Sequence, residues 1–360
     1  MALARPPAWA AADPEVSCRS CLVISDRGEI LWERDAHARV AIASTTKMVT
    51  ALVVRREARL DEEVTVSARA AATEQGKLSL VQGERFSVRE LLWGLLLNSS
   101  NDAAVALAEH VSGSEGAFVA QMNTLAAGLG ARDTSFTTSH GLDSPGHHST
   151  AIDLAKIAEE LLQDPVLAKM VGSLRHTIAG SQRSVILENT NVLLETYPGL
   201  LGVKTGFTAQ AGNVLVAAAQ RDGRRIVTVA LGSVDHFADT RVLLDLGFAR
   251  LSDQVLLERN VVVTTMLADG AGAFEILSGG PVRGLEPPNG AEYRVALRSD
   301  LQLPVVAGQR VGTVLVSAGG AVIGRSPALA AQSIGDSGGS WLATAIGDLL
   351  GAVAGVLPGE

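Results

Sequence analysis

The sequence predicts an α+β fold, in which an antiparallel sheet packs against a cluster of helices, followed by a small all-β domain. Two features of the hydrophobic pattern lead to this prediction. Apolar runs typical of strands stand near both ends of residues 15–250, and helical periodicity occupies the residues between them. Beyond residue 250, short apolar runs alternate with breaks rich in Gly and Pro, which is typical of a β-sandwich or a barrel.

Length and composition fit two domains and exclude some classes of protein. The chain has 360 residues, of which 47% are hydrophobic, so it can bury a core and is not a disordered chain. Its formal net charge is −8, it holds no run of basic residues, and only 4% of its residues are aromatic. Because phosphate binding needs clustered Lys and Arg, nucleic acid is not an expected partner.

The first expected element is a β-hairpin, because the apolar runs 22–25 and 30–33 flank a turn that contains Asp and Gly. Apolar residues at helical spacing then predict five helices, and Ser87 with Glu90 forms a capping-box pattern at the start of the second. These helices are expected at residues 44–54, 86–97, 102–110, 115–129 and 151–162. Three strands and a helix complete this part, at residues 200–205, 213–219, 225–231 and 238–248.

The C-terminal part is expected to contain short strands, a linker and an apolar tail. The strand candidates are residues 255–257, 261–266, 292–297 and 311–316. The expected domain organisation is a leader or signal-peptide remnant at 1–14, the α+β domain at 15–250, a β-sandwich domain at 251–333, and a linker with an amphipathic tail at 334–360.

The tail carries eight apolar side chains at helical spacing between residues 341 and 357. A Trp at one end and a one-sided apolar face favour an interfacial helix that contacts a membrane peripherally. Docking of this face on the protein itself is the alternative, since the tail holds no Lys or Arg to attract anionic lipids. No uninterrupted apolar stretch reaches the roughly 18 residues that a transmembrane helix needs, so none is expected.

The two cysteines, Cys18 and Cys21, lie three positions apart and lead into an expected strand. Positions three apart on a strand point to opposite faces, which disfavours a disulfide between them. Two unpaired, partly buried thiols are therefore favoured over a loop disulfide, and a metal site is favoured least.

Ser44 and Lys47 form a Ser-x-x-Lys pattern at the start of the first expected helix. Residues three apart share a helix face, so the Lys amine would lie beside the Ser hydroxyl. A neutral, desolvated Lys can take the hydroxyl proton and so create a nucleophile. Only five of the 30 basic residues are Lys, which marks Lys47 as a candidate for a task that Arg cannot perform. A capping Ser beside a surface Lys is the alternative interpretation.

Two further patterns carry polar groups that suit a substrate cleft. Ser99 and Asn101 stand in a break between two expected helices, where a hydroxyl and an amide can contact a substrate or only cap the second helix. Lys204, Thr205 and Gly206 lie on an expected strand, where Lys and Thr can bind a carboxylate and Gly lets another backbone approach. A strand that ends in a turn is the alternative for this second pattern.

In this order, the three patterns resemble the Ser-x-x-Lys, Ser-x-Asn and Lys-Thr-Gly motifs of penicillin-binding proteins and class A β-lactamases. Residues 43–48, 99–104 and 202–208 are similar to segments of the low-molecular-mass penicillin-binding proteins that are D-alanyl-D-alanine carboxypeptidases. Residues 140–153 resemble a further block of that family, and residues 304–312 resemble its C-terminal β domain. The resemblance therefore covers roughly residues 15–330, far more than three short motifs.

The resemblance implies a β-lactamase-like catalytic domain that removes the terminal D-alanine from peptidoglycan stem pentapeptides and is acylated by β-lactam inhibitors. Ser44 is the implied nucleophile, Lys47 its general base, and Ser99 a proton relay to the leaving amine. The backbone N–H groups of Ser44 and Phe207 are the implied oxyanion hole. The implied substrate-binding residues are Asn101, Lys204, Thr205 and Gly206.

The resemblance also implies an extracytoplasmic enzyme, in the periplasm or cell envelope, with the tail as an anchor to the cytoplasmic membrane. No cofactor and no metal are expected, and the histidines at 140, 147 and 148 are expected to make loop or core hydrogen bonds. A D,D-endopeptidase that cuts cross-links and a catalytically silent module that binds peptidoglycan or β-lactams are the alternatives. β-Lactamase activity is disfavoured, because no clear Glu-x-x-Leu-Asn block stands between the second and third motifs.

Overall fold

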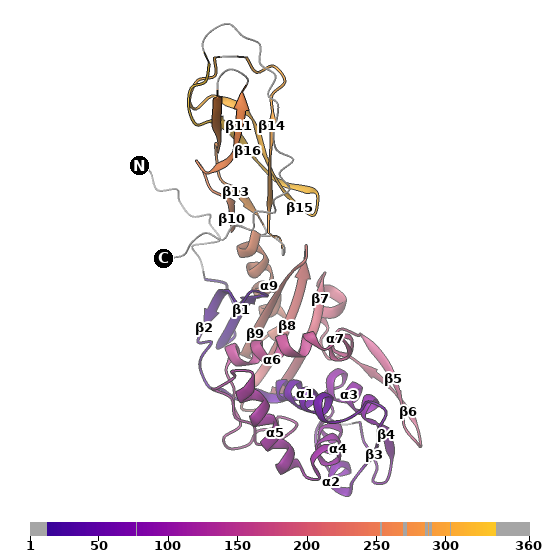
Figure 1. The fold of residues 1–360 in the computed structure, drawn as a ribbon. Coiled ribbons are helices and arrows are strands. Elements are labelled where there is room, and N and C mark those ends of the chain that lie inside the picture. The colour runs from indigo at the N-terminus through magenta and orange to yellow at the C-terminus, as the bar shows by residue number, and fades with distance from the viewer. Residues whose placement is uncertain are drawn as a thin grey trace. The chain divides into compact units, whose positions relative to one another are not determined.

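The computed structural model describes residues 13–335, apart from residues 77, 253, 269–271, 285–286, 288–289 and 303. The chain divides into two compact units (Figure 1). The first unit ends at Phe248, and the second contains the residues from Ala249 onward together with residues 222–224. Most of the expected leader and the whole apolar stripe at residues 341–357 lie outside the described residues.

A five-stranded sheet forms the centre of the first unit, in the order β2-β1-β9-β8-β7. Strand β1 pairs antiparallel with β2 and with β9, and β7 pairs antiparallel with β8. The hairpin and the three later strands predicted from the sequence are thereby confirmed, and β7 is an edge strand. The bounds are β1 (Ser20–Ser25), β2 (Ile30–Arg34), β7 (Leu200–Thr208), β8 (Gly212–Arg221) and β9 (Arg224–Ser233).

Helices cover both faces of this sheet, which explains why its central strands are apolar at nearly every position. Helix α6 (Ala151–Gln163) contacts β1 and β8. Helix α9 (His236–Ser252) packs on the opposite face, where a Cβ on Gly247 would lie 2.7 Å from Val23 and 2.8 Å from Ile226. The glycine therefore lets α9 approach the sheet closely.

The remaining helices of the first unit form a cluster, with α1 to α5 drawn below the sheet in Figure 1. The predicted capping pattern is present, since the Ser87 hydroxyl accepts a hydrogen bond from the Glu90 N–H at the start of α3. All five predicted helices exist, with the first beginning three residues later than expected. The bounds are α1 (Lys47–Glu57), α2 (Ala68–Ala71), α3 (Val88–Leu97), α4 (Asn101–Ser112), α5 (Glu115–Gly128), α7 (Pro165–Val171) and α8 (Leu193–Thr196).

Two small two-stranded antiparallel sheets in the first unit are not predicted from the sequence. Strand β3 (Glu63–Thr65) pairs with β4 (Arg85–Ser87), and β5 (Arg175–Ala179) pairs with β6 (Ser184–Glu188). Strands β5 and β6 each bury a single side chain, that of Ile178 or Leu187. In β6, Ile186 is exposed although it stands between Val185 and Leu187, so the continuous apolar run hides the alternation of burial.

Beyond the end of α9 at Ser252, the described residues of the second unit form strands and loops, as the sequence predicts. Its five-stranded sheet has the order β11-β12-β16-β15-β14, and β10 pairs with β13 in a smaller sheet. Its core is made of aliphatic side chains and Phe274. The bounds are β10 (Gln254–Leu257), β11 (Val262–Ala268), β12 (Gly272–Ser278), β13 (Val282–Gly284), β14 (Glu292–Leu297), β15 (Arg310–Ala318) and β16 (Ala321–Ala330).

The expectation of two unpaired thiols is wrong, because Cys18 and Cys21 form a disulfide. A strand that includes both cysteines would separate their side chains, but β1 begins at Ser20, and the chain bends at Arg19. Cys18 therefore lies outside the strand, and the alternation of side chains between two faces does not apply to it. The Cα atoms lie 6.1 Å apart, within the range that a disulfide spans.

Candidate active site

The segment that carries Ser44 is a short 3₁₀ helix, η2 (Ala43–Thr46), directly before α1. In a 3₁₀ turn, side chains three positions apart are eclipsed, so Ser44 and Lys47 lie on one side. The Lys47 Nζ lies 2.8 Å from the Ser44 Oγ. Ala43, the residue before the serine, has a φ of 46°, which is strained for a residue with a Cβ. The predicted pairing of the two side chains is thus present.

The Lys47 amine is completely buried and has three hydrogen-bond partners. Besides the Ser44 Oγ, these are the Asn101 Oδ1 at 2.7 Å and the His140 carbonyl oxygen at 2.7 Å. The last two are acceptors only, so they must take N–H groups from the amine. A neutral lysine then has its lone pair left for the Ser44 hydroxyl, the one partner of the three that can donate.

Burial lowers the pKa of Lys47 well below its usual value, because the charged form loses its hydration. The positive charge of Lys204 lowers this pKa further, whereas Asp102 acts in the opposite direction. Lys204 is itself buried, and its pKa is lowered to about 7 for the same reason. The site therefore holds two lysines that lose their protons far more readily than lysines in water.

Asn101 begins α4, and its side-chain orientation is fixed by its neighbours. The amide nitrogen donates to the carbonyl oxygens of Gln75 at 2.8 Å and of Glu74 at 3.3 Å, which turns the amide oxygen toward Lys47. The next residue, Asp102, accepts hydrogen bonds from the N–H groups of Leu78 and Leu80. The start of α4 thus holds residues 74, 75, 78 and 80 close to the lysine.

Ser99 lies in the break between α3 and α4, half-buried, with a φ of 61°. A left-handed conformation at a residue with a Cβ costs about 1 kcal/mol or more and often marks a functional position. The Thr190 N–H donates to the carbonyl of Leu97 at the end of α3, and its hydroxyl lies 2.5 Å from the hydroxyl of Thr205. Through these two contacts, Thr190 connects strand β7 with the break in which Ser99 lies.

Strand β7 passes directly beside η2, the segment that carries Ser44. A Cβ on Gly206 would lie 2.7 Å from the backbone nitrogen of Ser44, so only glycine allows this approach. The Lys204 amine donates to the carbonyl of Thr205 at 3.0 Å, and the Phe207 side chain is 67% exposed. Because β7 is an edge strand, its free edge can pair with an extended peptide.

The model of the peptidase family S11, described as D-alanyl-D-alanine carboxypeptidase, matches residues 8–235. The chain belongs to this D-alanyl-D-alanine carboxypeptidase family. The family resemblance predicted from the three motifs is therefore confirmed, and with it a serine-type peptidase with a penicillin-binding-protein fold.

Proteins from several bacteria are similar to this carboxypeptidase in sequence or in structure. D-alanyl-D-alanine carboxypeptidase DacF of Bacillus subtilis is 32% identical over 332 residues, which cover 88% of this chain and 85% of that protein. DacC of Escherichia coli is 30% identical over 351 residues, covering 90% and 86%. The crystal structure of a D-alanyl-D-alanine carboxypeptidase from Mycobacterium tuberculosis superposes with a TM-score of 0.64 and 35% identity, covering 68% of this chain and 96% of that one.

The candidate site also contains residues to which the sequence assigned no part in catalysis. A Cβ on Gly141 would lie 2.0 Å from the carbonyl oxygen of Ala43, so the loop after His140 packs directly on η2. The His147 Nδ1 accepts from the N–H of Thr137, which leaves the proton on Nε2, 2.7 Å from the Thr46 hydroxyl. His147 therefore makes the core hydrogen bonds that were expected of it, and these brace η2.

Glu115, the first residue of α5, supports the same loop from the other side. Its Oε1 accepts hydrogen bonds from the N–H and the hydroxyl of Ser139, and the His140 Nε2 lies 3.7 Å away. Burial lowers the pKa of His140 to about 4, so this ring is neutral at pH 7. Within the described residues, no group of three or more His, Cys, Asp or Glu side chains is arranged to hold a metal ion.

Proposed function

We propose that the protein removes the terminal D-alanine from peptidoglycan stem pentapeptides through an acyl-enzyme on Ser44, and that β-lactams acylate the same oxygen. The observation that carries the proposal is the buried hydrogen bond between Lys47 and Ser44. Both other partners of this amine are carbonyl oxygens, so a neutral Lys47 can only direct its lone pair at the serine. A residue placed in this way is a general base without histidine.

Acylation begins when Lys47 takes the proton of the Ser44 hydroxyl and the oxygen attacks the carbonyl of the penultimate D-alanine. The negative charge that develops on the carbonyl oxygen is stabilised by the N–H groups of Ser44 and Phe207. The close approach of Gly206 to the Ser44 nitrogen supports this role, because it sets the spacing between the two N–H groups. The C–N bond then breaks, and a proton from Lys47 reaches the leaving amine through the Ser99 hydroxyl.

Deacylation repeats these steps with water as the nucleophile. Water attacks the ester carbonyl, its proton passes to Lys47, and the ester bond to the Ser44 oxygen breaks. The oxygen regains a proton from Lys47, which restores the starting state. The balanced result is hydrolysis of one peptide bond, with release of D-alanine.

The terminal carboxylate of the substrate is recognised by Thr205 and Lys204. The Thr205 hydroxyl binds it directly and is positioned by its 2.5 Å contact with Thr190. Lys204 is a buried residue of β7, and it adds positive potential in surroundings of low polarity, where charge interactions are strong. Asn101 holds the amide of the substrate with the same side chain that orients Lys47.

Release of D-alanine from a stem pentapeptide tests the proposed reaction, and intact-mass spectrometry with a β-lactam tests the nucleophile. We expect one covalent adduct on the wild-type chain and none on Ser44→Ala. Ser317→Ala, a matched change in the all-β unit, should keep the adduct and the D-alanine release. An adduct that persists in Ser44→Ala would show that another residue is the nucleophile.

We also propose that residues 15–250 are the catalytic domain and that the enzyme acts outside the cytoplasm. The disulfide between Cys18 and Cys21 supports this location, because disulfides persist mainly in oxidising compartments. Within the part of the chain that the structure describes, no helix has the length and apolarity needed to span a bilayer.

For the residues 341–357, we propose peripheral contact with the cytoplasmic membrane. This proposal rests on the one-sided apolar pattern of the sequence. Truncation after Gly335, which keeps the core residue Ile334, should abolish flotation of the protein with liposomes and leave D-alanine release from a soluble peptide unchanged. A full-length chain that does not float would contradict it.

A further inference from the structure

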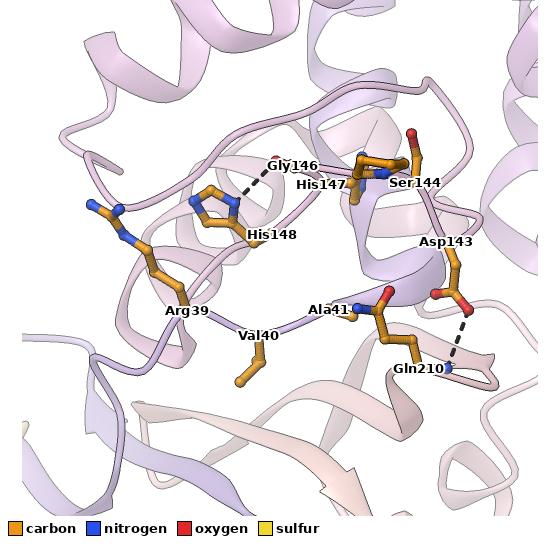
Figure 2. Close-up of a pocket in the computed structure, with 10 residues that line it drawn as sticks. Arg39, Val40, Ala41, Asp143, Ser144, Gly146, His147, His148 and Gln210 are labelled. Carbon is orange, nitrogen blue, oxygen red and sulfur yellow. Dashed lines mark hydrogen bonds between the residues drawn. The ribbon is translucent and has the colours of Figure 1, made fainter.

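A cavity of about 400 Å³ lies in the first unit between α3, α7 and β5. It shares no residue with the cavity drawn in Figure 2, whose lining includes the stretch 39–41 just before η2 and which belongs to the site already described. None of the residues that line the cavity between α3, α7 and β5 has a part in the reaction proposed above. Its side chains nevertheless combine an apolar surface with charges of both signs.

The buried part of this lining is apolar. Trp93 and Met170 are almost completely removed from solvent, and Val166 is half-buried. The Trp93 ring stacks on the ring of His176, with the centroids 3.8 Å apart and the planes at 14° to each other. Since small-molecule sites are lined mainly by apolar and aromatic side chains, this surface suits an aromatic or branched aliphatic group of a ligand.

Two basic residues, Arg89 and Lys169, form the exposed part of the lining. Among the residues that the structure describes, neither has a carboxylate in ion-pair contact, whereas Arg175, next to the cavity on β5, pairs with Glu188 at 3.2 Å. An arginine side chain has five N–H donors and a lysine has three. The two side chains can therefore both donate to a carboxylate of a ligand.

Glu90 adds a carboxyl group to the same lining. Its Oε2 is buried and has no hydrogen-bond partner within the described part of the chain. Burial raises the pKa of Glu90, whereas His176 and Arg89 act in the opposite direction. A buried acceptor without a partner is costly, and the last torsion of a glutamate turns easily, so this carboxyl group can accept from an ammonium of a ligand.

Two walls of the cavity continue into the candidate active site. On α3, the carbonyl of Gly94 accepts a hydrogen bond from the N–H of Ser100, the residue after Ser99, at 3.1 Å. The end of α7 contacts strand β7, because a Cβ on Gly202 would lie 2.9 Å from the Val171 side chain. A ligand held between α3 and α7 therefore acts on the break that contains Ser99 and on β7.

We propose that this cavity binds a free α-amino acid with a large apolar side chain, and that its occupancy changes the rate of acylation at Ser44. The carboxylate of the amino acid binds Arg89 and Lys169, and its ammonium binds Glu90. Its side chain contacts Trp93. Only the effect on Ser44 rests on the proposed function; the binding site itself does not.

Calorimetric titration of the full chain tests the binding with four probes. Phenylalanine carries all three groups, its amide lacks the carboxylate, N-acetylphenylalanine lacks the ammonium, and alanine lacks the large side chain. Both enantiomers of phenylalanine are titrated, and the series is continued with the one that binds more tightly. We expect phenylalanine to bind in the millimolar range, as suits so small a ligand. Each other probe should bind about threefold more weakly or worse, the size typical of an exposed ion pair.

Arg89→Gln and Lys169→Gln should each reduce the difference between phenylalanine and its amide, and Glu90→Gln should reduce the difference from N-acetylphenylalanine. Arg175→Gln is the matched control, because Arg175 is an exposed arginine beside His176 that does not line the cavity. It should keep every difference. Equal affinity for the four probes, or differences that survive in all three cavity variants, would overturn the site.

The rate of β-lactam adduct formation tests the effect on Ser44. Saturating phenylalanine should change this rate by about fivefold, a typical coupling between two sites. The concentration that gives half the change should equal the calorimetric Kd, and it should rise by the same factor as the Kd in Arg89→Gln. An unchanged rate, or a change that does not follow the Kd in Arg89→Gln, would overturn the effect on Ser44. A chain that forms no adduct at all would overturn that effect together with the proposed function, whereas the amino-acid site would still stand or fall on the calorimetry.

Discussion

The positive charge of Lys204 lowers the pKa of Lys47, and only burial of the amine has a larger effect. Both side chains are almost completely removed from solvent. A protonated Lys204 thus favours the neutral form of Lys47, which is the form that a general base needs. The lysine proposed to attract the substrate carboxylate therefore also prepares the base for catalysis.

The first prediction is a bell-shaped pH profile of kcat/KM. On the acid side, the rate should rise with pH as Lys47 loses its proton, at a pKa far below that of free lysine. On the alkaline side, the rate should fall as Lys204 loses its charge, with an apparent pKa of about 7 in the free enzyme. Steady-state D-alanine release across the pH range measures both limbs.

Lys204→Arg separates the two limbs, because an arginine keeps its charge throughout this pH range. The variant should lose the alkaline limb, whatever its overall rate, and keep the acid limb. An alkaline limb that stays near pH 7 in Lys204→Arg would assign that titration to another group.

The second prediction is that Lys47→Arg damages the enzyme nearly as much as Lys47→Ala. Arginine keeps the charge but cannot act as a base, so the rate of acylation should fall by about 10² to 10⁴ in both variants. The rate of β-lactam adduct formation, followed by intact mass, measures this step directly. Lys156→Arg is the control, because that lysine is partly exposed on α6 and should tolerate the change. A Lys47→Arg enzyme with most of its acylation rate would make Lys47 an electrostatic group only.

The pairing of Ser44 with Lys47 was predictable, because a spacing of three places side chains together in any helical turn. The neighbouring helices and the strand with Lys204 were predictable for a similar reason, since their periodicity extends over many residues. The partners of Lys47 show the limit of such local patterns. The carbonyl of His140 holds this amine from 93 positions away along the chain, and a backbone oxygen leaves no sign in the residue type.

The disulfide and the bracing of η2 could not be predicted for related reasons. The bend at Arg19 places Cys18 outside β1, where it can form the disulfide with Cys21. A shift of one residue in where a strand begins changes the face on which a side chain lies. In the sequence, Gly141 is only one residue of a segment that resembles the family. Glycine is required there because the loop contacts the backbone of Ala43, and this contact is known only from the folded structure.

The third prediction concerns Asp102, which is completely buried. Its carboxylate accepts hydrogen bonds from the N–H groups of Leu78, Leu80 and Ala103. In Asp102→Asn an NH₂ group would replace one acceptor and leave a buried N–H unpaired, at a cost of about 1–3 kcal/mol. The urea midpoint should therefore fall, whereas Asp61→Asn on the surface should change stability by less than about 0.5 kcal/mol. An unchanged midpoint in Asp102→Asn would show that residues 78 and 80 do not depend on this carboxylate.

The last prediction concerns Gly206, where a Cβ would lie 2.7 Å from the Ser44 nitrogen and 3.0 Å from the Cβ of Ala43. In Gly206→Ala, strand β7 must move away from η2, because the backbone of η2 cannot yield as a flexible side chain would. This movement should separate the two N–H groups of the proposed oxyanion hole and lower the rate of β-lactam acylation by about 10² or more, as the loss of one such donor does in other enzymes.

Gly116→Ala is the matched control for Gly206→Ala, because a Cβ there meets nothing within 4 Å, and alanine favours the helix α5. The control should acylate at the wild-type rate with equal or higher stability. Circular dichroism of Gly206→Ala must still show a folded chain for the comparison to count, and a folded variant that acylates normally would mean that β7 contributes no donor to the site.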